Sequence, residues 1–344
     1  MASAAGATDA GSPREASRLE TSPARPHVRV RADASVIRLP ASPDSSPLVW
    51  SSLPASSAVL EGGRRVHRWR AGLDLASPEA DSVPRLQCDV EVIGVEGHVY
   101  ESATIVDGTL EEGLRQWHGT GGGLSMGYAW EHRWEPRRAF RVEAAGAYGT
   151  WAGPLEQWTR HTQAAVTQQW VAGGTASGGW SEGHIAVRMV GAWGAGELSG
   201  GVGWVQHQGW SRYVTRPAPV LLRDETSGSE WATYDRSQCD EVEVRWHGVV
   251  LPLEVRWPLG RGISATAGGV AWWATRSRHL QDRFVVAAPG QPPYEGEPLV
   301  IESRERPVGW AWRVGLDFGG DDQPHWHVEA SSAGRLAVGF TTHP

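Results

Sequence analysis

The chain has 344 residues, a formal net charge of -7, and 32 positively charged residues that are all arginine. An acidic balance without lysine offers no basic patch that could follow a phosphate backbone, so the sequence predicts no nucleic-acid partner. The two cysteines, Cys88 and Cys239, exclude a disulfide-dense scaffold and a zinc site of four thiolates, and the sequence leaves open whether they pair.

Residues 1–63 are rich in Ala, Ser and Pro and have little periodic apolar character, as in SPREASRLETSPARP. This composition predicts a disordered leader or linker. The first residues contain no apolar segment of the length that a secretory signal needs. From residue 64 the composition shifts to Val, Trp, Arg and Gly in short alternating runs. We therefore expect one all-β domain over residues 64–344, with regular strands from about residue 117.

The clearest strand pattern is GLSMGYAWEHRW, residues 123–134. Leu124, Met126, Tyr128 and Trp130 share a large and mostly apolar face, and the residues between them are small or charged. The turn residues EPRR follow, and a second alternating run starts at residue 140. This period of two on both sides of a turn predicts a β-hairpin.

The same stretch begins with the G-x-S-x-G pattern that carries the nucleophile of many hydrolases, here Ser125. That chemistry needs a strand, a strained turn and a helix, whereas the alternation continues to Trp134. We interpret Ser125 as a small inward residue of a strand, and we predict no catalytic residue and no cofactor. A Ser, a His and an acid that share one lumen are an alternative, for which the histidines on or beside strands are His118, His132, His161 and His184.

Further alternating runs extend to residue 340, and their connections have two lengths. Short ones at 135–138, 194–197, 258–262 and 320–324 alternate with long ones near 152–183, 215–239 and 278–305. In an antiparallel meander alternate connections lie at opposite ends, so the short turns share one rim and the long loops the other. Tight periplasmic turns and long external loops predict an antiparallel up-and-down transmembrane β-barrel. By this loop count the final strand ends on the long-loop side.

Large aromatic side chains lie close to the short turns, where a membrane–water interface favours amphipathic rings. We predict five membrane-interface aromatics: Trp130, Trp134, Trp193, Trp257 and Phe318. Charged residues oppose each other across the first hairpin, namely Glu131, Arg133, Arg141 and Glu143. They are candidate charges of the lumen, and an ordinary solvated strand face is an equally open interpretation.

Two further groups of residues show weaker patterns, one for a metal site and one for ligand binding. His325 and His327 share a face beside Asp321 and Asp322, which are ligand types of divalent metals. An acidic turn followed by interfacial polar residues is the favoured interpretation, so no metal site is predicted. Tryptophans in the expected long loops could stack on a sugar or a hydrophobic ligand, or pin the loops to the rim: Trp158, Trp170, Trp180 and Trp231.

The segment VVLPLEVRWPLGRGISATAGGVAWWA, residues 249–274, contains a strand, a short turn with Gly and a Gly-rich strand. It resembles a hairpin of the outer-membrane β-barrel proteins of Bacteroidetes-type bacteria, a porin-like family. PVGWAWRVGLDFGG, residues 307–320, resembles the next strand of that family. The resemblance covers about residue 117 to the C-terminus, and it implies a bacterial outer-membrane location and a barrel of about eight to ten strands.

The sequence therefore favours a non-enzymatic outer-membrane barrel with a structural or adhesive role or limited solute passage. The expected partners are outer-membrane lipid and a small solute or glycan at the long loops. The alternatives are a soluble all-β module whose Trp residues bind carbohydrate, and a barrel that hydrolyses lipid. The face of Leu124, Met126, Tyr128 and Trp130 separates the first alternative from the others, because a membrane barrel exposes this face to lipid and a soluble module buries it.

Overall fold

The structure is a computed structural model and describes residues 27–40, 55–76, 82–135, 138–260, 262–319, 324–332 and 334–342. These residues form one sheet of fifteen strands. In chain order the strands are β1 (His27–Pro40), β2 (Ala55–Ala76), β3 (Ser82–Ile105), β4 (Leu110–Glu135), β5 (Arg138–Gln163), β6 (Val166–Trp193), β7 (Gly196–Thr215), β8 (Ala218–Asp224), β9 (Glu230–Gly260), β10 (Ile263–Ala287), β11 (Tyr294–Glu295), β12 (Leu299–Glu305), β13 (Val308–Phe318), β14 (His325–Ser331) and β15 (Arg335–Thr342). No helix among these residues could span a membrane.

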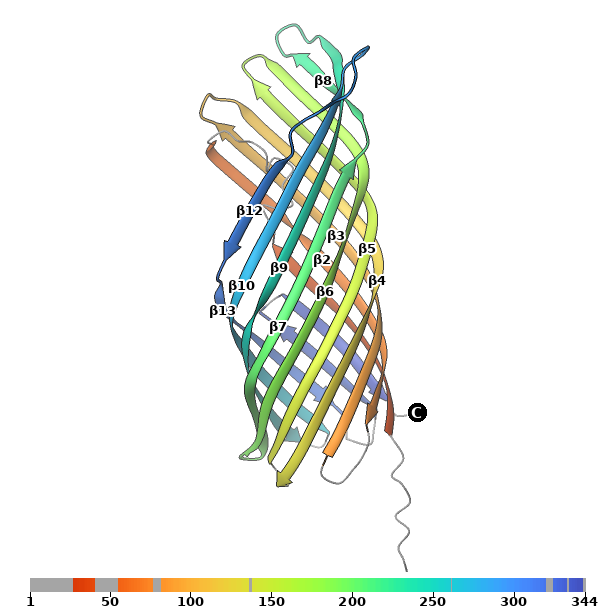
Figure 1. Ribbon diagram of the computed structural model, residues 1–344, viewed down its shortest axis with the longest axis vertical. Helices are drawn as coiled ribbons and strands as arrows, with labels where there is room; N and C mark the ends of the chain where they lie inside the picture. The colour runs from red at the N-terminus through yellow and green to blue at the C-terminus, as the bar shows by residue number, and fades with distance from the viewer. Residues whose placement is uncertain are drawn as a thin grey trace, which may run out of the picture.

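The sheet closes on itself as a barrel (Figure 1). Strands that follow one another along the chain are antiparallel neighbours, and β15 pairs with β1 from Val30↔Thr342 to Ile37↔Arg335. Two positions of the ring are each filled by two strands. β7 and β8 both pair with β6, and β12 and β13 both pair with β10. The predicted antiparallel up-and-down barrel is confirmed.

The number of strands is higher than the about eight to ten that the resemblance implies. Part of the difference lies at the N-terminal end, where β1 pairs with β2 from His27↔Ala76 to Pro40↔Gly63. The predicted domain boundary at residue 64 is therefore wrong for residues 27–40 and 55–63, which belong to the barrel. Residues 1–26 and 41–54 of the expected leader lie outside the described residues.

The segments expected to be long loops are mostly strand, and they add β8, β11 and β12 to the count. β5 and β6 continue through residues 152–183, interrupted only at 164–165, and stay paired from Arg138↔Gly191 to Gln163↔Val166. β8 and β9 fill most of 215–239, and β10 extends to Ala287. In 152–183 both faces carry small and polar residues, so the sequence has no period of two although the ladder continues.

The short turns lie together at one rim, as predicted, because they join β4 to β5, β6 to β7, β9 to β10 and β13 to β14. The final strand also ends at this rim. Its end pairs with the beginning of β1, and β1 begins beside the end of β2 at His27↔Ala76. The expectation that it ends on the opposite side is wrong, because the last alternating run consists of two antiparallel strands, β14 and β15, and the loop count treated it as one.

The strands divide the barrel into two parts of different construction (Figure 1). The part next to the short turns, the proximal half, contains every strand of the ring. The distal half consists of the continuations of the long strands, the end of β1 and the short strands β8, β11 and β12, because β13, β14 and β15 are short. Among the described residues, β12 pairs only with β10 and residues 55–62 of β2 pair only with β3, so the distal half is open along one side. On β4 the two halves meet near residue 121.

Candidate functional site

The outer surface of the proximal half is an apolar band. On β4 the outward side chains of Leu124 and Met126 are 62% and 60% exposed. Exposed apolar residues occupy equivalent outward positions on the other strands: Val28, Val30, Leu73, Val90, Val92, Ile185, Met189, Val202, Leu251, Leu253, Val314, Leu316 and Val338. Soluble monomers do not expose a contiguous apolar surface of this extent, whereas a lipid-facing barrel requires one. The alternative of a soluble module that buries this face is therefore wrong.

The five predicted interface aromatics all lie on the outer face near the short turns. Trp193 and Trp257 contact each other edge to face across the β6–β7–β9 region, with 5.9 Å between their ring centroids. Trp130 packs edge to face on Phe140 at 6.4 Å. Trp134 and Phe318 are exposed at the ends of β4 and β13. Together they form an aromatic row at the border of the band that faces the short turns.

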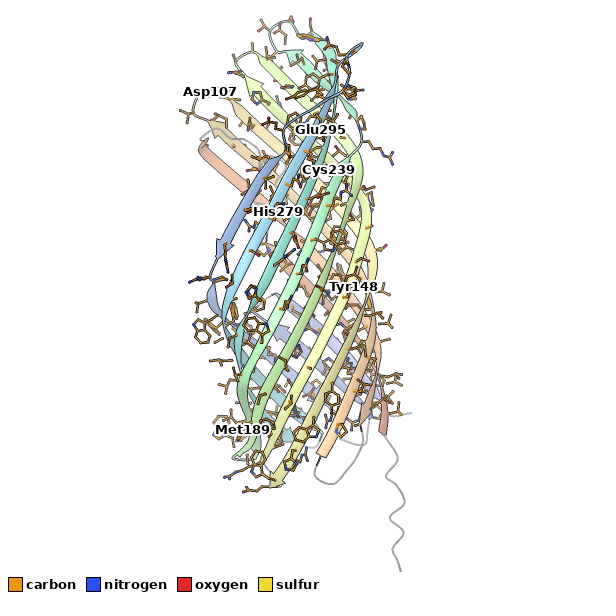
Figure 2. The ribbon with its side chains drawn as sticks, viewed as in Figure 1. Asp107, Tyr148, Met189, Cys239, His279 and Glu295 are labelled. Carbon is orange, nitrogen blue, oxygen red and sulfur yellow. The ribbon has the colours of Figure 1, made fainter. Side chains whose placement is uncertain are left out.

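A second aromatic row, which the sequence analysis missed, lies at the other border of the band. Its exposed members are Trp69, Tyr148, Trp204, Trp273 and Trp310. Figure 2 shows how far this row lies from the short turns: Tyr148, a member of the row, lies at mid-height, whereas Met189 lies close to the short turns. The sequence contains a signal for this row, namely a change from apolar to polar residues on the outer face of a strand. On β7 this face carries Trp204 and then continues with Gln206 and Gln208. Two aromatic rows around an apolar band are typical of transmembrane β-barrels.

The inner wall of the proximal half is charged, and it includes the four candidate lumen charges. Glu131 is buried and accepts hydrogen bonds from Arg133 Nε at 2.7 Å and from Arg141 Nη2 at 2.5 Å. Arg141 Nη1 lies 3.5 Å from Glu143, which also pairs with Arg188 at 3.2 Å. Glu131, Arg141 and Glu143 line a recess of about 410 Å³, and Arg133 lies nearer the rim. The structure thus brings all four residues into one network on the lumen side.

Ser125 lies on the same wall as a rung of β4. Its hydroxyl donates to Asp89 at 3.2 Å, and Asp89 also accepts from Arg31 at 2.5 Å and from Gln87 at 2.9 Å. β4 continues as a strand to Glu135, so the strained strand-to-helix turn of a hydrolase is absent at this position. The carboxylate next to Ser125 is held by an arginine, which leaves Ser125 as part of a structural polar network.

The four histidines considered as partners of Ser125 lie apart from one another. His184 lines the same recess as Ser125. His132 stacks on Trp130 with 5.8 Å between ring centroids, and His161 Nδ1 lies 3.1 Å from Glu111 in the distal half. His118 faces outward on β4. Of these four histidines, only His184 therefore shares a recess with Ser125.

The interior of the distal half has the opposite character, since it is a packed apolar core. Its buried members are Ile93, Val95, Val99, Trp117, Trp151, Leu155, Ala176, Trp180 and Tyr213. Trp117 contacts Tyr213 edge to face at 5.3 Å, although β4 and β7 are not neighbours in the sheet. Gly97 and Gly149 are required here, because a Cβ at either position would overlap the indole of Trp117 or Trp180. These side chains pack across the barrel at this level and surround a cavity of about 450 Å³.

The four tryptophans expected in long loops lie on strands. Trp170 and Trp180 point inward and are 2% and 8% exposed, so they belong to the interior. Trp231 is exposed and Trp158 is half-buried on the outside. Three arginines stack on inward aromatic rings: Arg68 on Trp180 at 4.9 Å, Arg115 on Tyr213 at 4.7 Å and Arg236 on Trp170 at 4.9 Å.

A buried polar network crosses the barrel above this core. Arg115 on β4 forms an ion pair with Asp240 on β9, both almost fully buried, and its Nε donates to Gln157 at 2.9 Å. Gln238 donates to Asp240 at 3.0 Å. Because β4 and β9 lie on different sides of the ring, the Arg115–Asp240 pair spans the lumen. Burial and the nearby carboxylate of Asp240 raise the pKa of Asp282 to about 8, so Asp282 is mainly neutral at pH 7.

The metal-ligand candidates lie only partly within the described residues. His325 and His327 lie on β14, while Asp321 and Asp322 lie outside the described residues. No group of three or more His, Cys, Asp and Glu side chains within the described ranges could hold a metal ion. Cys88 on β3 and Cys239 on β9 are both free thiols.

No protein-family model matches the sequence, and no curated protein matches it either. Among solved structures, the chain is similar to the translocator domain of the autotransporter NalP from Neisseria meningitidis, with 12% identity, 92% of this chain and 88% of that chain covered, and a TM-score of 0.37. It is similar to the β-domain of the Bordetella autotransporter BrkA, with 10% identity, coverage of 93% and 99%, and a TM-score of 0.39. It is also similar to the outer-membrane protease OmpT from Escherichia coli, with 6% identity, coverage of 93% and 96%, and a TM-score of 0.34.

The fold is that of an outer-membrane β-barrel. The evidence for this fold is the closed ring of strands, the apolar band and the two aromatic rows of this chain. The similar structures include translocator domains and a protease, at identities where similarity indicates the fold alone.

Proposed function

We propose that this protein is a non-enzymatic barrel of a bacterial outer membrane, in which the proximal half anchors the chain and the distal half projects outside the cell in a structural or adhesive role. The single observation that supports this proposal is the reversal of polarity along the strands. Apolar side chains face outward in the proximal half and inward in the distal half. Membership of the Bacteroidetes-type family stays a prediction.

The strand lengths support the division into an anchor and a projection. β9 has 31 residues, and at about 3.3 Å per residue it extends roughly 100 Å along its axis. A membrane crossing requires only about 9 to 11 residues of a tilted strand. The remaining length lies on the side opposite the short turns, which in outer-membrane barrels is the extracellular side.

The contents of the barrel argue against a wide, permanently open pore. The Arg115–Asp240 ion pair crosses the lumen, and Trp117 reaches Tyr213 from the other wall. Limited passage is a second candidate, because the recess of about 410 Å³ and a cavity of about 450 Å³ lie on either side of His207 and Glu182, whose Nδ1 and Oε2 atoms are 3.9 Å apart. Opening that contact would join the two spaces.

The two native cysteines provide a direct test of the proposed orientation. Cys88 faces outward within the apolar band, where it pairs with Met126, and Cys239 faces outward in the distal half. The chain is expressed with an outer-membrane signal peptide, and intact cells are treated with a membrane-impermeant maleimide. Labelling of the Cys88→Ser variant but not of the Cys239→Ser variant is expected.

The opposite labelling pattern, or recovery of the protein in the soluble fraction, would overturn the proposed orientation or the membrane location. Gel mobility before and after boiling identifies the folded barrel in each sample. Conductance in planar bilayers then decides between the two roles. A closed lumen gives no steady current, whereas discrete openings that grow in the His207→Ala variant would support limited passage.

A further inference from the structure

The cavity of about 450 Å³ in the distal half is a candidate ligand site that extends beyond the proposed role of the barrel. Its walls come from β1, β2, β3, β4, β5, β6, β7, β9 and β10, so the barrel itself shapes it. Aromatic and branched apolar side chains form most of the lining: Val66, Val95, Val99, Trp117, Trp151, Trp180, Tyr213, Val242 and Val244. Cavities of a few hundred cubic ångströms with such walls suit small organic ligands.

The charged side chains of this cavity all have the same sign. Arg64, Arg68 and Arg276 line it, together with His207, and its described lining contains no Asp or Glu. The two carboxylates that interact with Arg68, Glu91 and Glu182, lie outside this lining: Glu91 pairs with Arg70 at 3.0 Å, and Glu182 lies 3.9 Å from His207. Three guanidinium groups around an apolar cavity favour a ligand that combines an apolar body with a negative charge.

Unsatisfied donors point to the same class of ligand. Nε of Arg68, Nε1 of Trp117 and Nε1 of Trp180 are buried and have no hydrogen-bond partner in the described part of the chain. All three residues line the cavity, and the two tryptophans are 4% and 8% exposed. A buried donor without an acceptor costs free energy. The three unsatisfied atoms of this cavity are all donors, so the cavity lacks acceptors only. The oxygens of a bound carboxylate would supply what these donors lack.

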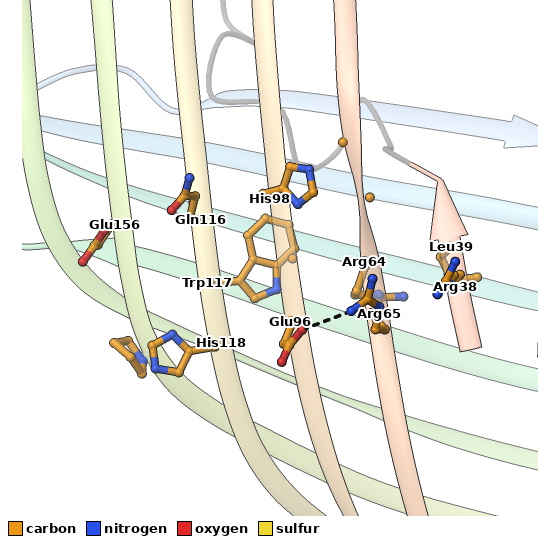
Figure 3. Close-up of a pocket in the computed structure, with 14 residues that line it drawn as sticks. Arg38, Leu39, Arg64, Arg65, Glu96, His98, Gln116, Trp117, His118 and Glu156 are labelled. Carbon is orange, nitrogen blue, oxygen red and sulfur yellow. Dashed lines mark ion pairs between the residues drawn. The ribbon is translucent and has the colours of Figure 1, made fainter. Parts of the chain in front are cut away.

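An outer recess connects this cavity to the surface. The recess has a volume of about 720 Å³ and shares Leu39, Gly63, Arg64 and Trp117 with the cavity. Figure 3 shows it beside the end of β1, with Arg38, Arg64 and Arg65 on one side and Glu96 3.9 Å from Arg65. The recess lies where β1 ends and the distal half loses a wall strand. Arginines therefore line a path from the surface to Arg68.

We propose that the distal cavity binds an organic acid with an apolar aliphatic or aromatic body. The body packs against Trp117, Trp151 and Tyr213, and the carboxylate accepts hydrogen bonds from Arg68 and from the tryptophan Nε1 groups. Arg64 forms the passage between the recess and the cavity. This assignment is independent of whether the barrel serves adhesion or passage.

The test uses 11-bromoundecanoate, because bromine quenches tryptophan fluorescence at contact distance. The refolded full chain in detergent micelles is titrated with the probe, and unbrominated decanoate is added as a competitor. We expect saturable quenching that decanoate reverses. The Arg68→Gln variant should bind the acid at least tenfold more weakly, because it loses a charged hydrogen-bond donor.

Two controls separate specific binding from partition into the micelle. Arg245→Gln removes the same charge from an exposed ion pair with Glu243 on the outer surface, and its affinity should stay within twofold of the native value. The neutral probe 11-bromoundecanol should bind more weakly than the acid. Equal affinity of the alcohol and the acid, or equal affinity of the two variants, would overturn the proposal.

A folding check keeps the result interpretable. Each variant is examined for its mobility shift on boiling. If Arg68→Gln fails to fold, Arg276→Gln removes another lining guanidinium and is held to the same tenfold criterion. Quenching that decanoate cannot reverse in the native chain would also contradict the site, whatever the outcome of the membrane-labelling experiment.

Discussion

The distal and proximal parts of β4 differ in which face carries the apolar side chains, and this difference is typical of the whole barrel. In the distal part Trp117 points inward and is buried, while His118 faces outward. In the proximal part Leu124 faces outward and is exposed, while Ser125 points inward to Asp89. One continuous strand therefore places its apolar residues on opposite faces, and the change occurs within a few residues.

This reversal shows that the surroundings of the strand, and not the strand itself, decide which face is apolar. Against lipid tails, apolar side chains belong on the outside, and charges are tolerated only in the lumen, where Arg141 and Glu131 pair. Against water, apolar side chains gain by leaving the solvent, so they gather inside. The second aromatic row lies where the lipid-facing and water-facing parts of the barrel meet, so the proposed orientation places the outer border of the membrane at this row.

The largest effect is expected from removal of a buried distal tryptophan. Trp170 is 2% exposed, and its Nε1 donates to the carbonyl of Arg236 at 3.1 Å. Trp170→Ala should lower the free energy of unfolding by about 3 to 5 kcal/mol, because it leaves a cavity in a packed interior. Urea titration of the refolded barrel measures this loss.

The matched control is Trp231→Ala, which removes an exposed tryptophan from the same half of the molecule. We expect a change below about 1 kcal/mol, as is usual for surface positions. Equal losses for the two variants would mean that the distal interior is not a core, and the contrast between the halves would fail.

A charge on the outer face should distinguish the halves with a somewhat smaller effect. Met126→Arg places a guanidinium in the middle of the apolar band and should cost about 2 to 4 kcal/mol in a lipid bilayer. His118→Arg places the same group on the outer face of the distal part of β4 and should be almost neutral. The folded fraction in lipid vesicles, measured from the mobility shift, compares the two. A harmless Met126→Arg would contradict the lipid-facing band.

The sequence could predict the proximal half because lipid and lumen impose opposite residue types on alternate positions. The run from Gly123 to Trp134 has this alternation, and the structure shows its large face outside, as expected for a barrel. β1 contains the same pattern, with Val28 and Val30 outside and arginines between them, but its Ser- and Pro-rich surroundings concealed it. Composition averaged over a long segment thus hid a strand that residue-by-residue alternation reveals.

The distal half and its cavity could not be predicted in the same way. Near Leu155 both faces of β5 carry small, polar and apolar residues, because water lies outside and a mixed core lies inside. The cavity combines Arg68 of β2 with Trp180 of β6 and Arg276 of β10, which only the register and closure of the barrel bring together. A single sequence contains no signal for such distant pairings. The lumen pair of Glu131 and Arg141 was accessible because one tight turn joins its two strands.

The pH dependence of stability should come from the distal interior. Burial and Asp240 raise the pKa of Asp282 from 3.8 to about 8. Since the folded state holds this proton more tightly than the unfolded state, Asp282 weakens the fold as pH rises from about 4 to 8. Asp282→Asn should remove this contribution, so its stability relative to the native chain should increase between pH 5.5 and pH 8.5. The expected gain is on the order of 3 kcal/mol, because a proton that only the folded state retains changes the stability by about 1.4 kcal/mol per pH unit from pH 5.5 to about 8.

Urea titrations of both proteins at these two pH values measure the difference. Groups away from residue 282 titrate alike in both proteins, so their contributions cancel, and the difference reports Asp282 together with its neighbour Asp240. A difference that does not grow as pH rises would show that the folded barrel does not hold the Asp282 proton more tightly than the unfolded chain.

The smallest effect concerns the aromatic row near the short turns. Trp193 and Trp257 contact each other edge to face, and a double-mutant cycle with alanine should give a coupling of about 0.5 to 1.5 kcal/mol. This coupling should be the same in detergent and in a bilayer, because it belongs to the pair. The loss from Trp193→Ala alone should be larger in the bilayer, where the indole also occupies the membrane–water interface. Trp231→Ala, in the distal half, should give the same loss in both media. If Trp193 behaved like Trp231, the row would be an ordinary surface pair, and the border of the membrane would have to lie elsewhere on the barrel.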